Sequence, residues 1–128
     1  MAKRGWSKPL SGFIDQSREK MMVTMTAASE EAARDVIYAS PKDTSRYLAN
    51  HNFSVNEPDE SFDESRRDIS RNDALANARR AIAALRPGDV FHVVNTTPYG
   101  EFLEYGTSRM APYAVYTKAA NNMREKYG

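Results

Sequence analysis

The sequence predicts an α+β fold, with a small sheet of two to four mainly antiparallel strands packed by a long N-terminal helix and a C-terminal helix. Two short segments have the alternation or the β-branched content of strands, and the segments around them carry apolar residues at helical spacing. The chain has 128 residues, the size of one ordinary domain. Because a sheet this small is marginal by itself, the two long helices are expected to cover it.

Residues 1–12 are interpreted as an N-terminal arm that precedes a single α+β domain at 13–128. Two glycines and Pro9 disfavour regular structure in the arm. Trp6 is a large apolar residue with no local partner, so it either folds back on the core of its own chain or docks on a neighbouring subunit. The basic residues of the arm are not followed by an apolar stretch, so the arm is unlike a secretory signal.

Residues 13–39 predict a long helix without internal glycine or proline. Its apolar residues recur at spacings of seven, four, three, four and four, in the stripe Ile14, Met21, Met25, Ala28, Ala32 and Val36. The methionines suit either an adaptable binding face or core packing, and the regular spacing favours the core. Ser40-Pro41 ends the helix, because the residue before a proline avoids the helical region.

A turn and then a strand are expected within 41–55. Asp43 and Thr44 have the side chains that stabilise tight turns. Phe53 and Val55 alternate with polar residues, which is the pattern of a half-buried strand.

Residues 56–70 predict a long projecting loop. It carries five acidic residues between positions 57 and 64, followed by Arg66 and Arg67, and Phe62 is one of its few apolar residues. Loops of this length in compact domains are usually functional or disordered. We therefore expect this one to contact a partner, and a solvated loop is the alternative.

A second helix is predicted to begin at Ser70, because Ser70 and Asp73 have the spacing of a capping box. The buried stripe is expected to be Leu75, Ala78, Ile82 and Leu85. An Arg-Pro-Gly sequence at 86–88 ends this helix. Residues 90–94 are rich in β-branched side chains and predict the second strand.

A short helix and a final helix complete the predicted fold. Thr97 is expected to cap the short helix, with Pro98 at its first position and Gly106 as a left-handed residue at its end. A loop at 107–111 leads to the last helix. That helix is expected to begin near Pro112 and to place on one face Val115, Ala119 and Met123.

Composition narrows the possible functions. The chain has no cysteine, which excludes disulfides, thiolate catalysis and zinc–thiolate sites. The net charge of +1 argues against a dedicated nucleic-acid binder, although residues 1–64 carry 8 basic and 11 acidic side chains (net −3) and residues 65–128 carry 10 and 6 (net +4). Such halves can pair within one chain or between chains. No apolar run approaches the roughly 20 residues that cross a bilayer, so no membrane partner is expected.

The sequence offers no catalytic, metal-binding or cofactor-binding constellation. His51 and His92 have no second histidine or carboxylate at metal-ligand spacing, and a packed ring explains His92 better than a catalytic base does. Glu101 and Glu104 share a face of the short helix, but no nucleophile accompanies them. Solvent or an intersubunit ion pair is the favoured role for both glutamates. We therefore expect that the protein is not an enzyme.

Aromatic residues are crowded into the segment 95–112 and just beyond it. The set Tyr99, Phe102, Tyr105, Tyr113 and Tyr116 falls within 18 residues, with Arg109 and Met110 between its members. Tyrosine, arginine and methionine are enriched at protein interfaces. Part of the set must be core, and the remainder is more aromatic surface than a monomer normally exposes.

Two motifs stand out: Ser40-Pro41-x-Asp43-Thr44, and Val94-Asn95-x-x-Pro98-Tyr99-Gly100-x-Phe102-Leu103-Glu104-Tyr105-Gly106-Thr107-Ser108-Arg109-Met110-Ala111-Pro112. Together with the order of the elements they resemble the signature of the HK97-type tail-component family of tailed bacteriophages. Members of that family are also called tail completion or neck proteins. The chain departs from the family pattern where Ser45 replaces glycine, Gly100 replaces the common alanine and Tyr113 replaces phenylalanine.

The resemblance implies a structural protein of the virion, made in the host cytoplasm. Such subunits form a ring, commonly sixfold, at the head–tail junction, where they join the connector or stopper to the tail terminator or tail tube. The ring surrounds the channel through which DNA passes without sequence-specific binding, and no cofactor is involved. A closed ring needs two different patches on each subunit.

The resemblance also assigns roles to particular residues. It implies a structural turn at Pro41, Asp43 and Thr44, and another at Gly106, Thr107 and Pro112. Glu104 and Arg109 become candidates for a charge-assisted contact that fixes the turn or reaches the adjacent subunit. The subunit or partner interface would comprise Trp6, Phe62, Arg66, Arg67, Tyr99, Glu104, Tyr105, Arg109 and Met110.

The alternative function is a small nucleic-acid-binding module. It would use a basic stripe between Arg66 and Arg80, made of Arg66, Arg67, Arg71, Arg79 and Arg80. A solvated helix face explains the same residues without any ligand. Sequence-independent binding that weakens steeply with salt would separate this alternative from the ring.

Overall fold

The computed structural model describes residues 2–41, 45–68, 70–109 and 112–127, with side chains from Arg18 onward. Its elements are α1 (Ala2–Ala39), α2 (Ser45–Ala49), β1 (Asn52–Val55), α3 (Asn72–Ala83), β2 (Phe91–Val94), α4 (Gly100–Tyr105) and α5 (Val115–Tyr127). The two strands pair antiparallel and form the one sheet of the described residues. The predicted α+β class is confirmed, with long helices at both ends of the chain.

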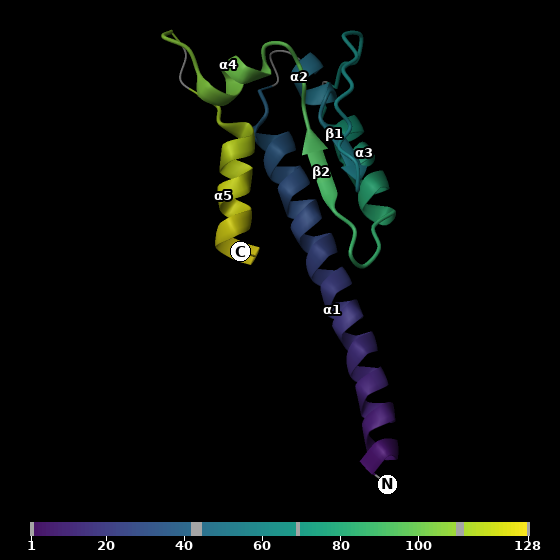
Figure 1. Cartoon of the computed structure of the whole chain (residues 1–128). Coiled ribbons are helices and arrows are strands. Elements are labelled where there is room, and N and C mark those ends of the chain that lie inside the picture. Colours follow the sequence, from purple (N-terminus) through teal and green to yellow (C-terminus); the bar gives the residue numbers. More distant parts are fainter. Residues whose placement is uncertain (1, 42–44, 69, 110–111, 128) are drawn as a thin grey trace.

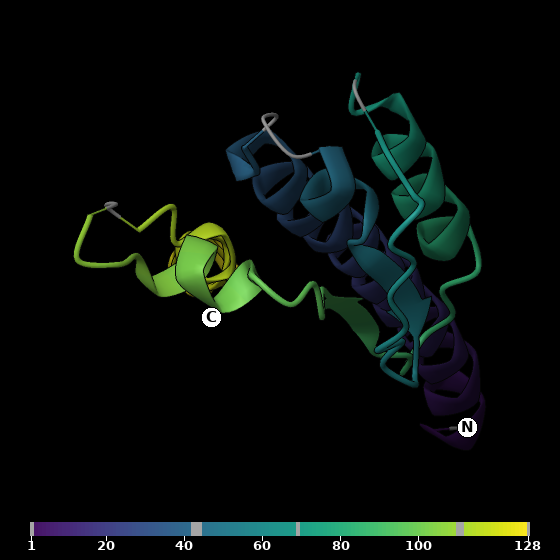
Figure 2. The same ribbon diagram turned by 90° about the horizontal axis from the view of Figure 1, so that it is seen from above.

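Helix α1 is the centre of the fold. Figure 1 shows it running the length of the molecule, and Figure 2 shows α5 on one side of it and α3 on the other. The β1–β2 sheet, whose strands are separated in sequence by α3, lies beside that helix, and β1 packs against it. At 38 residues α1 is about 57 Å long, so its N-terminal part extends past the rest of the domain.

Two apolar clusters, one on each side of α1, form the core. The first joins α1 to α3 and packs against Phe53, and its buried members are Ala33, Ile37, Leu48, Ala74 and Ala78. The second joins α1 to α4 and α5, and its buried members are Val36, Tyr47, Leu103, Val115 and Ala119. Because adjacent α1 residues, Val36 and Ile37, enter different clusters, the helix is buried on two sides rather than along one stripe.

This arrangement corrects the predicted apolar stripe of α1. Of the stripe residues with described side chains, Val36 is fully buried, whereas Met21 is 55% exposed. The buried α1 residues outside the predicted stripe include Ser29, Ala33 and Ile37, and a search for large apolar side chains does not find Ser29 or Ala33. Small residues serve here because α3 and α5 approach α1 closely from two directions. The predicted end of the helix before Pro41 is confirmed.

The predicted boundary between an irregular arm and a helix at residue 13 is wrong, because α1 begins at Ala2. Glycines cost a helix about 1 kcal/mol each, and an interior proline about 3 kcal/mol, but none of these costs prohibits the conformation. Pro9 removes one amide donor, while the backbone around it keeps helical geometry. The docking predicted for Trp6 concerns a side chain outside the described ones.

The start of α3 also differs from the prediction. Arg71, with φ 68°, precedes α3 and makes no side-chain cap, and Ser70 does not form the predicted capping box. Instead the buried carboxylate of Asp68 accepts a hydrogen bond from the Ala74 amide at 2.8 Å. The left-handed conformation of Arg71 takes the chain out of the geometry that a capping box needs. Asp68, which lies earlier in the sequence, therefore accepts a hydrogen bond from an amide in the first turn of α3.

Arg71 has a different structural role, at the C-terminus of α1. Its Nε donates to the Ile37 carbonyl and its Nη2 to the Ser40 carbonyl, each at 3.1 Å. The guanidinium also lies 5.6 Å from the centre of the Tyr38 ring. A cation at this end of a helix interacts favourably with the unpaired carbonyls and the macrodipole. Arg71 therefore joins the start of α3 to the end of α1.

The chain between the two motifs is folded more tightly than predicted. Residues 45–49 form α2, which no apolar pattern indicated. The 56–70 loop does not project freely, because side chains of Asn50 and Asn52 donate to its backbone carbonyls at 2.6–3.0 Å. The Thr96 hydroxyl, just after β2, donates to the Glu60 carbonyl at 2.9 Å. These bonds hold the loop along the edge of the domain.

Candidate assembly interface

The segment 95–106 folds around Asn95, which directly follows β2. The Asn95 side-chain oxygen accepts from the amide and the hydroxyl of Thr97, at 3.0 and 2.5 Å. Its side-chain nitrogen donates to the Tyr47 carbonyl at 2.8 Å. Thr97 therefore stabilises the turn before α4 and does not cap α4, which begins at Gly100. The strand-ending asparagine of the motif joins β2 to α2.

Glu104, on α4, caps the last helix. Its two carboxylate oxygens accept from the amides of Tyr116 and Thr117 at 2.9 and 2.8 Å, and one also accepts from the Thr117 hydroxyl at 2.6 Å. Burial raises the pKa of Glu104, but these hydrogen bonds outweigh it and leave the pKa below its ordinary value. Of the two roles expected for Glu104, fixing the turn is the one visible within this chain.

Gly106 ends α4 in a conformation that favours glycine. Its φ of 78° and ψ of −178° belong to a region that side chains with a Cβ rarely enter. The positive φ was predicted, but the residue is extended rather than left-handed helical. From there the chain turns back over α4, and the Tyr113 amide donates to the Leu103 carbonyl at 2.8 Å. Consequently α5 begins at Val115 and not near Pro112.

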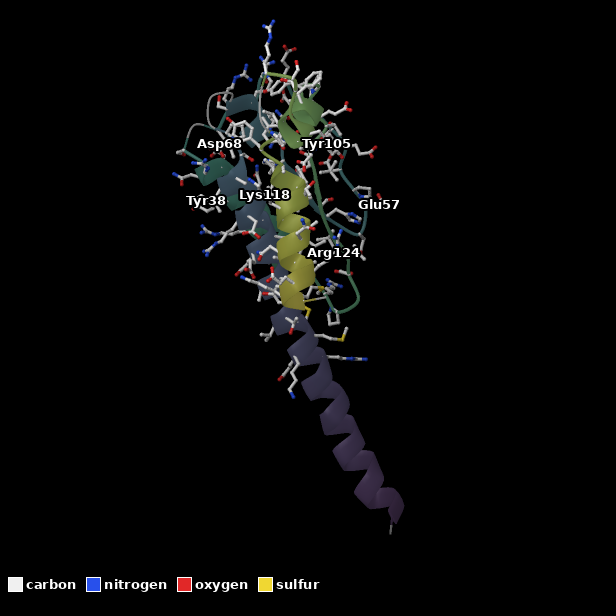
Figure 3. All side chains as sticks on the ribbon, turned by 90° about the vertical axis from the view of Figure 1, so that its left-hand side faces the viewer. Tyr38, Glu57, Asp68, Tyr105, Lys118 and Arg124 are labelled. Atoms are coloured by element: carbon white, nitrogen blue, oxygen red, sulfur yellow. The ribbon has the colours of Figure 1, made fainter. Side chains whose placement is uncertain are left out.

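The aromatic residues of this region divide into an inward and an outward set. Tyr99 and Tyr116 pack against the second apolar cluster. Phe102 and Tyr105 are 56% and 73% exposed, and Tyr113 is 37% exposed. Figure 3 shows Tyr105 at the end of the domain opposite the N-terminal half of α1. The predicted interface omitted Phe102 and Tyr113, which are exposed, and included Tyr99, which packs inward.

The remaining predicted interface residues are dispersed. Arg109 is exposed, and its amide donates to the Thr107 hydroxyl at 3.2 Å. Phe62 and Arg66 are half-buried and Arg67 is exposed, all on the 56–70 loop. Among the described residues no ion pair joins Glu104 to Arg109. Three further predicted residues, Asp43, Thr44 and Met110, lie outside the part of the chain that is described.

A cleft lies beside the outward aromatic set. Its volume is about 440 Å³, and it is bounded on one side by α4 and on the other by α2 and α5. The ring of Tyr105 and the carboxylates of Glu101 and Glu104 line it, together with Tyr47 and Tyr116. A cleft lined by tyrosines and carboxylates suits an apolar or basic side chain of another protein surface.

A buried polar network, centred on His51, lies behind this cleft. The Ser40 hydroxyl donates to the Val36 carbonyl at 2.6 Å, so it must accept from His51 Nε2–H, which is also 2.6 Å away. His51 Nδ1 then accepts from the Tyr116 hydroxyl at 2.7 Å and from the side-chain nitrogen of Asn95 at 3.2 Å. The network therefore requires a neutral imidazole protonated at Nε2.

The environment of His51 agrees with that charge state. The residue is 2% exposed, and desolvation lowers its pKa from 6.5 to about 3. Burial likewise raises the pKa of Tyr116, so its hydroxyl stays protonated and able to donate. Because the end of α1, the residue before β1, α5 and the turn after β2 all contribute, this network is a structural junction. Sequence reasoning placed His51 near the first strand and found no partners for it.

The described residues contain no group of histidines and acids that could hold a metal ion. In the same part of the chain, no helix combines the length and the apolar character needed to span a bilayer. Comparisons with protein-family models, with curated proteins and with solved structures found no match.

Proposed function

We propose that this chain is a structural virion subunit of a tailed bacteriophage, a tail completion or neck protein that forms a ring at the head–tail junction. The observation that carries the proposal is the construction of the segment 95–106. Its polar residues fold the chain, through Asn95 and Glu104, while Phe102 and Tyr105 of the same short helix remain exposed. A rigid element that presents large apolar side chains is suited to protein association.

The shape of the subunit supports a ring. Helix α4, which carries Phe102 and Tyr105, lies at one end of the domain, and the N-terminal half of α1 extends from the other end (Figure 1). Two different surfaces on one chain permit a head-to-tail contact between copies, which is the kind of interface that closes a ring. On this proposal, neighbouring copies, the connector or stopper, and the tail terminator or tail tube are the partners, and DNA passes through the channel.

Light scattering on the purified full-length chain, across a concentration series, tests the association. We expect a defined oligomer, with closed rings visible by electron microscopy. Phe102→Ser combined with Tyr105→Ser should reduce the oligomer to monomers while the circular dichroism spectrum is kept, because both residues are exposed. Val90→Ser is the matched control, since Val90 is 55% exposed and lies just before β2, away from α4.

The virion itself gives the second test. We expect the chain among the proteins of purified particles, at the junction of head and tail in a reconstruction. The proposal fails if the chain is absent from particles and stays monomeric when it is mixed with purified connectors and tails. A monomer in isolation is compatible with subunits that oligomerise on their platform, so the particle composition decides.

A further inference from the structure

We propose that a groove between α3 and the 56–70 loop binds the phosphodiester backbone of a nucleic acid without reading its sequence. Two hollows, of about 380 and 360 Å³, lie against α3 and share three lining residues, Arg66, Asn77 and Arg80. Arg67 lines the second hollow as well. Three guanidinium groups from a loop and a helix thus converge on one groove.

The donors of these arginines are largely available. Arg80 donates to the Asn77 side-chain oxygen at 3.1 Å, and Arg66 makes a long contact of 3.5 Å to Asn52. Arg67 donates through Nη1 to the carbonyls of Glu64 and Arg66, the latter at 2.9 Å, which leaves its Nε and Nη2 donors available. Within the described residues the ion pairs are Arg46–Glu64 and Lys126–Glu31, so no groove arginine belongs to one. A guanidinium has five N–H donors, and most of them here remain free to contact a ligand.

The lining favours phosphate over a peptide. Its apolar members are mostly alanines, so the groove has no deep apolar hollow for the large side chains that dominate peptide recognition. Arginine and asparagine side chains are common phosphate ligands, and arginine contacts phosphate through two parallel hydrogen bonds. Asp59 and Asp73 also line the groove, one in each hollow. Three guanidiniums against two carboxylates give the lining residues a net charge of +1.

The structure divides the basic stripe that the sequence suggested. Arg71 is bound to the end of α1, and Arg79 lines a separate hollow with Glu30 and Arg34. The groove therefore holds only Arg66, Arg67 and Arg80 of that stripe. This division provides a control, because Arg34 and Arg79 carry the same charge as the groove arginines but line a different hollow.

Fluorescence anisotropy with a labelled single-stranded oligonucleotide tests the groove. Three phosphate contacts predict a slope of about −2 in a plot of log affinity against log salt, which is about 20-fold weaker binding at 200 mM than at 50 mM. Arg66→Gln with Arg80→Gln should reduce the slope to about −0.7. Arg34→Gln with Arg79→Gln removes equal charge and should keep the wild-type slope. Circular dichroism checks that both double variants fold.

Three outcomes would overturn the proposal. Binding that is absent, or that does not weaken with salt, excludes phosphate contacts by the groove. Equal losses in the two double variants would show a diffuse charge effect. Polyglutamate that competes with equal affinity, and with the same dependence on Arg66 and Arg80, would identify an acidic protein segment as the ligand. None of these measurements depends on ring formation, so this groove and the ring proposal can fail separately.

Discussion

Acidification is expected to destabilise the fold through His51. Its imidazole is buried and neutral, and desolvation lowers its pKa from 6.5 to about 3. A group whose pKa falls on folding contributes stability that is fully present above the unfolded pKa and is lost as the pH decreases toward the folded pKa. The loss is about 1.4 kcal/mol per pH unit between these two values. From pH 7.5 to pH 5 the free energy of unfolding should therefore decrease by about 2 kcal/mol.

Urea unfolding followed by circular dichroism, at several pH values between 7.5 and 5, measures this loss. Some carboxylates, such as Glu104 and Asp89, have a pKa below the ordinary value and titrate below pH 5. They therefore do not account for the loss of stability between pH 7.5 and pH 5. Proton NMR gives an independent measurement, because the ring resonance of a neutral, buried His51 should stay unchanged over the whole range.

The decisive comparison uses His51→Gln and His92→Gln. The first variant should be less stable at pH 7.5, by about 1–3 kcal/mol, because it leaves buried partners unpaired. Its stability should nevertheless be nearly independent of pH between 7.5 and 5. The second variant removes the other imidazole and should keep the wild-type dependence. If His51→Gln retained the full loss of stability on acidification, the assignment of the buried neutral histidine would be refuted.

Two further substitutions, Glu104→Ala and Gly106→Ala, test the turn around α4, with Glu101→Ala as a control. Glu104→Ala should lower the free energy of unfolding by about 2 kcal/mol, because three hydrogen bonds to the start of α5 are lost. Glu101→Ala, at an exposed site, should change the free energy of unfolding by less than about 0.5 kcal/mol. Gly106→Ala should cost about 1–3 kcal/mol, because φ 78° with ψ −178° is strained for any residue with a Cβ. Thermal denaturation measures all three variants, and a neutral Gly106→Ala would contradict the strain argument.

Most of the fold was predictable because its signals are local. The order of the main elements and the end of α1 before Pro41 followed from spacing and from punctuating residues. The α2 helix was missed because its five residues are too few to show a period. The start of α1 was missed because glycine and proline weaken a helix without forbidding it.

The candidate site was less predictable, because its decisive bonds join residues that are distant in sequence. His51 contacts Tyr116, which is 65 residues away, and Asn52 holds a loop that starts beyond the end of its own strand. Neither bond leaves a local pattern. For Glu104 the sequence favoured solvent or an intersubunit ion pair, with a turn-fixing contact as a further candidate role. Its partners in α5 depend on how the chain returns over α4, which no local pattern indicates.

The position of Glu104 on α4 connects the stability of the fold to the proposed association. Phe102 and Tyr105 lie two residues before and one residue after it, so the bond from Glu104 to α5 also fixes the helix that presents them. Glu104→Ala should therefore weaken both folding and association. Phe102→Ser and Tyr105→Ser should weaken association alone, because these exposed side chains contribute little to the core. A Glu104 variant that lost stability yet assembled normally would show that α4 does not present the contact surface.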